Sequence, residues 1–188
     1  FRWDEFVDRE NNELIGNYGN FINRVLTLTH RLESNTDQNP LSKYEMLDKY
    51  EDLIKQIKEL HSKATESLEK QRFKEALRYI MTISQKGNVL LQQSAPWKYL
   101  NSEESEEKND SLSGLALAWR IARSLAILTR PFMPFQSERL WSMLGENLVI
   151  DNILWHDAML FESKLTWNEA RPTALFKKLD LKEIIARE

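Results

Sequence analysis

Apolar residues recur along most of the chain at the three- and four-residue spacing of an amphipathic helix. The first such segment begins near Trp3 or Glu10 and runs to about Leu32. The apolar stripe of this segment consists of Leu14, Tyr18, Phe21, Val25 and Leu28, flanked by Ile15 and Ile22. Residues 34–40 (SNTDQNP) are rich in turn formers and end it. The pattern predicts a long first helix with one buried face.

The same spacing predicts further helices over residues 44–69 and 71–93. Their stripes are Leu47, Tyr50, Ile54, Ile57, Ala64 and Leu68, and then Phe73, Leu77, Ile80, Ile83 and Leu90. Residues 101–110 (NSEESEEKND) are acidic and of low complexity, which indicates a solvated loop. Residues 111–130 form a helix that is apolar on nearly every side, which is typical of a central buried helix.

The segment PFMPF, residues 131–135, breaks this fourth helix. A short helix over residues 136–144 follows and ends at Gly145, which suits a C-cap. The tail contains short helical pieces, the segment LTWNEA and a closing helix after Lys178. No strand-like alternation of any length and no internal repeat is present in the sequence. We therefore predict an all-α fold, an antiparallel helix bundle.

The composition and motifs of the chain give no sign of a metal site or a catalytic site. The chain has 188 residues, no cysteine and three histidines, none of which is spaced for a metal with a second ligand. It shows no glycine-rich phosphate loop and no nucleophile-elbow serine. We expect a domain that binds rather than catalyses, without a metal or cofactor of its own. Because it opens without an initiator Met, we interpret it as part of a longer protein, a processed mature chain being the alternative.

The stretch ELIGNYGNFINRVL, residues 13–26, holds glycines and asparagines that are poor helix formers. Gly16 and Gly19 would let another group approach the backbone closely. Asn20 and Arg24 are one turn apart and could reach one partner together, and an amide and a guanidinium suit base edges. The alternative is an ordinary solvated face whose glycines make room for another helix.

A second unusual stretch is QQSAPWKYL, residues 92–100, where the third helix ends. Pro96 fixes the direction of the chain, so that Trp97 follows a helix end beside Lys98. An aromatic ring held in this way makes a stacking platform for an unpaired base. The alternative is that Trp97 lies in the core, as most tryptophans do. The net charge of −3 gives no general support to nucleic-acid binding, which therefore depends on such specific residues.

Four segments together resemble the C-terminal anticodon-binding domain of methionyl-tRNA synthetases of the archaeal or eukaryotic type. They are NNELIGNYGNFINRVL, APWK, RIARSLAILTRPFMPFQSERLWSMLG and LTWNEARPTALFKKLD, and they span nearly the whole chain in the order of the family. The class I synthetases for valine, isoleucine, leucine and cysteine share the helical domain without this combination. Another class I synthetase and a helical protein-interaction module are the alternatives.

The resemblance implies a set of contacts with the CAU anticodon of methionine tRNA. Asn20 and Arg24 would hydrogen-bond the anticodon bases, and Trp97, after Pro96, would stack on the wobble cytosine. The accessory RNA contacts expected on this basis and from the helix pattern are Asn17, Asn23 and Lys98, with Arg31, Lys98 and Arg120 as phosphate contacts. Single-stranded loops suit such recognition because their bases expose the Watson–Crick edges.

The resemblance also implies a parent ligase. Residues 1–165 would be the anticodon-binding bundle, and residues 166–188 a segment that packs back toward the parent's catalytic domain. ATP and Mg²⁺ would bind in that domain, upstream of this chain, and not here. The expected partners are methionine tRNA and the parent's own catalytic domain, in the cytoplasm, with no membrane.

Overall fold

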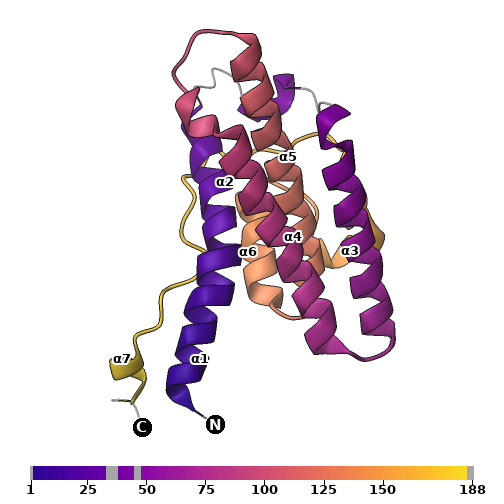
Figure 1. The fold of residues 1–188 in the computed structure, drawn as a ribbon, viewed down its shortest axis with the longest axis vertical. Helices are drawn as coiled ribbons and strands as arrows, with labels where there is room; N and C mark the ends of the chain where they lie inside the picture. Colours follow the sequence, from indigo (N-terminus) through magenta and orange to yellow (C-terminus); the bar gives the residue numbers. More distant parts are fainter. Residues whose placement is uncertain (1, 33–37, 45–47, 186–188) are drawn as a thin grey trace.

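The computed structural model describes residues 2–32, 38–44 and 48–185, and within them it contains helices and no β-strand (Figure 1). The long helices are α2 (Asn20–His30), α3 (Glu51–Glu69), α4 (Phe73–Ser94), α5 (Glu106–Thr129) and α6 (Pro134–Met143). Shorter pieces are α1 (Trp3–Arg9), α7 (Leu181–Ile185) and five 3₁₀ turns: η2 (Pro40–Lys43), η3 (Asp48–Tyr50), η4 (Pro96–Lys98), η5 (Ile150–Asn152) and η6 (Trp155–Met159). The prediction of an all-α bundle is confirmed.

Helix α5 lies at the centre of the bundle and packs against α2, α4 and α6. By length and composition it is the one helix among the described residues that could cross a membrane, but 89% of its apolar window is buried inside the bundle. Trp119 on α5 and Trp141 on α6 are each only 1% exposed. The predicted role of this segment as the central buried helix is confirmed, because its apolar surface faces other helices on all sides.

The first helical segment runs without interruption from Trp3 to His30, so of the two starts that the sequence left open the observed one is Trp3. The middle of this segment differs from a regular helix, since η1 (Glu10–Gly19) has the wider π-helical turn. A Cβ at Gly16 would lie 3.2 Å from the Asn11 carbonyl oxygen, five residues earlier. Low helix propensity and a missing side chain therefore favour a local departure from the α-helix here.

Two predicted helix starts were wrong by five residues or more. Helix α5 begins at Glu106, so the second half of the segment predicted as an acidic loop is helical. The Ser105 Oγ accepts a hydrogen bond from the Lys108 N–H, and Glu106 and Glu107 in the first turn complement the helix dipole. Helix α3 begins at Glu51 instead of residue 44, and the 3₁₀ turn η3 precedes it. Leu47, assigned to that helix, lies outside the described residues.

Helix α6 begins at Pro134, two residues before the predicted start, because proline is well accommodated in a first helical turn. The predicted C-cap at Gly145 is confirmed. Its φ is +78°, and the amides of Gly145 and Glu146 donate to the carbonyls of Ser142 and Trp141. This is a Schellman arrangement, in which a left-handed residue satisfies the last carbonyls of the helix.

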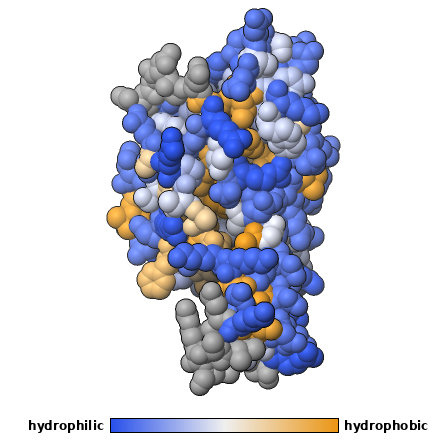
Figure 2. Space-filling view, turned by 90° about the vertical axis from the view of Figure 1, so that its left-hand side faces the viewer, coloured by the Kyte–Doolittle hydropathy of each residue, from blue (hydrophilic) through white to orange (hydrophobic). Residues whose placement is uncertain are grey.

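After α6 the chain returns along the first helical segment (Figure 1). The Trp167 ring lies 4.4 Å from the His30 ring, and the ring of Phe176 lies 5.8 Å from that of Tyr18. Further along, the Asn11 amide donates to the Leu179 carbonyl at 3.0 Å and accepts from the Leu179 N–H at 2.9 Å. Figure 2 shows this side of the molecule, where hydrophilic residues surround smaller apolar patches. The tail is thus held on the first helix.

Candidate nucleic-acid interface

The corner between α4 and α5 presents Trp97. Ala95 ends α4 in the left-handed conformation, with φ 44° and ψ 49°, and its N–H donates to the Leu91 carbonyl at 3.1 Å. Pro96 is buried and starts the short turn η4, in which the Lys98 N–H donates to the Ala95 carbonyl at 3.0 Å. A non-glycine residue in this conformation is uncommon and costs free energy, so the surrounding structure must hold it.

The structure brings Trp97 and Arg24 together. The guanidinium carbon of Arg24, on α2, lies 5.2 Å from the centroid of the Trp97 ring, within cation–π distance. Trp97 is 38% exposed, so the alternative that it belongs to the core is wrong. With Arg24 beside one face, the ring is oriented and still accessible to solvent. Two of the predicted site residues, far apart in the sequence, therefore form one surface.

Asn20 is exposed on the same helix, one turn before Arg24. The amide of Asn20 donates a long hydrogen bond, 3.4 Å, to the side-chain oxygen of Asn88 on α4. The Asn88 amide in turn donates to the Asn17 carbonyl at 3.0 Å. Asn88 is a residue that the sequence analysis missed. The signal available was its position one turn after Ser84 on α4, two polar residues on a helix face that packs against the first helix.

The accessory residues have different surroundings. The Asn17 amide donates to the Met81 carbonyl at 3.1 Å, and its oxygen accepts from Ser84 at 3.2 Å, so this side chain ties the first helix to α4. Asn23 and Lys98 are exposed, and among the described residues neither side chain has a hydrogen-bond or ion-pair partner. They remain open to a ligand, whereas Asn17 already has partners inside the fold.

The arginines predicted as phosphate contacts differ in their exposure. Arg31 is exposed at the end of α2. Arg120 is half-buried on α5, and burial lowers the pKa of its guanidinium. Its Nε is buried without a hydrogen-bond partner in the described structure. Of the two, only Arg31 stands on the surface as a phosphate contact requires.

The expectation that the glycines leave open backbone for a ligand was wrong for Gly19. A Cβ at this position would lie 3.2 Å from Cδ2 of Phe176, so the chain's own tail occupies the space beside it. The glycine therefore permits a close contact between the tail and the first helix. This interaction depends on residues that are far apart in sequence, and the pattern of one helix did not reveal it.

Histidines and acidic residues do not assemble into a metal site in the described part of the chain, where no group of three or more potential ligands lies together. His30 faces the tail, with its Nε2 3.0 Å from the carbonyl oxygens of Asn168 and Ala170. His61 stacks on Trp155, with the ring centroids 5.6 Å apart. Both histidines therefore contact other parts of the fold.

Comparison with known proteins agrees with this architecture. Residues 51–186 match the model of the family described as the anticodon-binding domain of tRNA ligase. A methionine–tRNA ligase of Methanopyrus kandleri is 37% identical over 185 residues, which are 95% of this chain and 25% of that protein. A methionine–tRNA ligase of Cytophaga hutchinsonii is 40% identical over 145 residues, 77% of this chain and 20% of that protein.

Among solved structures, the apo form of Mycobacterium tuberculosis methionyl-tRNA synthetase superposes with a TM-score of 0.80. The sequence identity is 21%, and the match covers 96% of this chain and 35% of that one, so it shows the shared fold. The chain spans a quarter or less of the length of the two relatives named above. It belongs to the anticodon-binding domain family of tRNA ligases, in the form found in methionine–tRNA ligases.

Proposed function

We propose that this chain reads the CAU anticodon of methionine tRNA for a ligase that attaches methionine to that tRNA. The observation that carries the proposal is the exposed Trp97 ring, held by Pro96 at the end of α4 and covered on one side by Arg24. The names of the relatives agree with it. In the whole ligase, which would act in the cytoplasm, a separate catalytic domain would bind ATP and Mg²⁺.

The wobble cytosine stacks on the face of Trp97 that Arg24 leaves open. A guanidinium is planar and carries five N–H donors at its edge, so Arg24 can remain over the ring and still donate to an acceptor on a base. Asn20 lies one helical turn away and offers both a donor and an acceptor. Its only hydrogen bond in the described structure is the long one to Asn88, which a base can displace at small cost.

Preorganisation favours this arrangement. Trp97 has only two side-chain torsions to fix, and the turn that follows Ala95 already holds its backbone. A base that stacks there therefore orders little of the protein, and most of the stacking free energy contributes to affinity.

Electrostatic attraction of the RNA is local, because the net charge of the chain is −3. Arg24, Arg31 and Lys98 supply positive charge near the corner and at the end of α2.

The test is binding of the chain to a methionine-tRNA anticodon stem–loop at low salt, measured by fluorescence anisotropy. The same stem–loop with its wobble cytosine changed to uracil is the RNA control. We expect wild type to prefer cytosine, and Trp97→Ala to lose about 1–3 kcal/mol of binding free energy together with that preference. Circular dichroism of Trp97→Ala should show an unchanged helix content.

Equal binding of both stem–loops by wild type would contradict the proposal. Preference for the anticodon of another tRNA would instead assign the chain to a different class I ligase. A Trp97→Ala variant that unfolds would show that the ring has a structural role despite its exposure, and Trp97→Phe, which keeps an aromatic ring, would then be used to measure stacking.

A further inference from the structure

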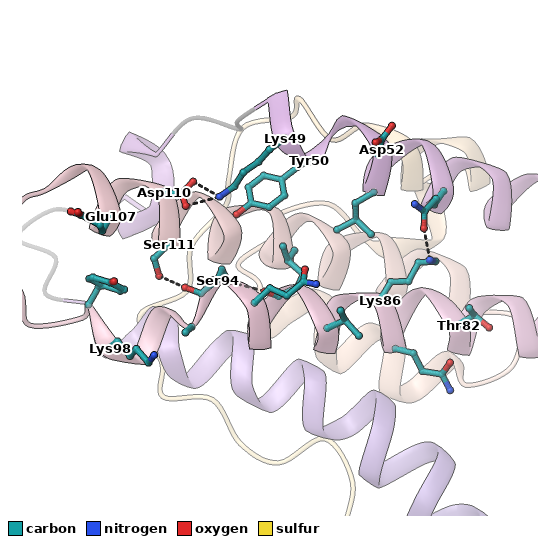
Figure 3. A pocket seen from close by; sticks show the side chains of 18 residues that line it. Lys49, Tyr50, Asp52, Thr82, Lys86, Ser94, Lys98, Glu107, Asp110 and Ser111 are labelled. Atoms are coloured by element: carbon teal, nitrogen blue, oxygen red, sulfur yellow. Dashed lines mark hydrogen bonds and ion pairs between the residues drawn. The ribbon is translucent and has the colours of Figure 1, made fainter.

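A groove of about 880 Å³ lies between α3 and α4, and the beginning of α5 closes one of its ends (Figure 3). The α4–α5 corner contributes to that end through Ala95, Lys98 and Tyr99. Trp97 comes from the same corner but faces Arg24 on α2. The corner therefore has the stacking surface on one side and the groove on the other.

Polar side chains suited to RNA line the groove. Apolar residues that line it include Leu53, Val89 and Leu90, of which Val89 is 54% exposed. The polar side chains contributed by α4 are Thr82, Gln85, Lys86, Gln93 and Ser94. Lys86 and Gln93 are two helical turns apart, which corresponds to about 10 Å along α4. Amides supply donors and acceptors for base edges, and an ammonium group supplies charge for a phosphate.

Charge is distributed unevenly between the two walls of the groove. The three carboxylates that line it, Asp52, Glu107 and Asp110, belong to α3 and α5, whereas α4 contributes none. Asp110 is paired with Lys49. Lys86 donates at 2.5 Å to Gln56, which is neutral, so its positive charge is not compensated. A phosphate in the groove is thus attracted to the α4 wall and repelled from the opposite wall.

We infer that this groove binds an unpaired nucleotide of the same RNA loop that stacks on Trp97, with its phosphate on the α4 wall beside Lys86. The inference rests on the proposed function. The RNA strand passes over the α4–α5 corner, because Ala95, Lys98 and Tyr99 line the end of the groove that is next to Trp97. Gln85 and Gln93 contact the base from α4.

One test uses a pair of matched variants on α4 in the anisotropy assay, with salt concentration varied. Lys86→Gln removes the positive charge that α4 contributes to the groove, and Lys74→Gln removes an exposed charge near the start of the same helix, outside the groove. We expect Lys86→Gln to weaken stem–loop binding about three- to tenfold and to reduce the slope of log K against log salt by about 0.7, as for one lost phosphate contact on a single strand. Lys74→Gln should change neither quantity.

A second test uses the absence of cysteine from the chain. Val89→Cys places a single thiol in the lining of the groove, and Leu148→Cys places one at a residue that is 63% exposed and does not line the groove. Saturating stem–loop should slow alkylation of the thiol at least threefold in Val89→Cys and leave the rate unchanged in Leu148→Cys.

Equal effects of the two lysine variants, together with unprotected Val89→Cys, would overturn the inference. If Trp97→Ala still abolished cytosine preference in that case, the proposed function would stand and only the groove would be excluded as an RNA site. If wild type showed no anticodon preference and Trp97→Ala bound as wild type does, the proposed function would fail and the groove inference would fail with it.

Discussion

The contact between Gly87 on α4 and Phe21 on α2 sets the distance between the two helices that carry the candidate interface. A Cβ at residue 87 would lie 2.5 Å from Cε2 and Cζ of Phe21 and 3.0 Å from Cδ2. Carbon atoms in van der Waals contact are about 3.5–4.0 Å apart, so the ring would have to move by about 1 Å. Phe21 is fully buried, which leaves it little room to do so.

The expected effect of Gly87→Ala follows from two opposing free energies. Overpacking a well-packed core costs about 1–3 kcal/mol, and a rigid, fully buried ring places this case in the upper part of that range. Replacing glycine by alanine inside a helix contributes about 1 kcal/mol of stability. We therefore expect Gly87→Ala to lower the free energy of unfolding by about 1–2 kcal/mol, measured by urea denaturation followed by circular dichroism.

A second variant separates the steric effect from other causes. In a Phe21→Leu background the two atoms nearest the new methyl group, Cε2 and Cζ, are absent, so the helix-propensity gain should dominate. Adding Gly87→Ala to Phe21→Leu should then be neutral or stabilising, a reversal of sign. The reasoning is refuted if Gly87→Ala stabilises the otherwise unchanged chain, or if it destabilises both backgrounds by the same amount.

Two further results are expected from the contacts of Arg24 and His61. In a double-mutant cycle of Arg24→Met and Trp97→Ala, urea denaturation should give a coupling of about 0.5–1 kcal/mol, as for a solvent-exposed cation–π pair, and effects that simply add would contradict that pairing. Burial lowers the pKa of His61 below its ordinary value, so the unfolded chain takes up a proton more readily than the folded one as the pH falls below about 6.5. The free energy of unfolding should therefore be largest above that pH and decrease on acidification. His61→Phe keeps a ring against Trp155 and should flatten this decrease, whereas parallel pH profiles for both proteins would exclude His61 as its source.

Much of the candidate interface could be predicted because local sequence fixes it. Pro96 constrains its own backbone, and so the appearance of Trp97 just beyond the end of α4 follows from neighbouring residues. Asn20 and Arg24 share a helix face because a helix repeats every 3.6 residues. The partners of these residues could not be predicted in the same way. Arg24 over Trp97 and Asn88 beside Asn20 depend on how α2, α4 and the corner pack.

The helical class, the central position of α5 and the C-cap at Gly145 could be predicted from the sequence, because hydrophobic periodicity and backbone preference act over a few neighbouring residues. The contacts of each polar or glycine position follow instead from the packing of the helices and the tail. Gly19 accommodates Phe176, and Asn17 bonds to α4 instead of remaining open to a ligand. These outcomes depend on contacts between segments far apart in the chain, where close packing determines which surfaces are covered and which remain exposed.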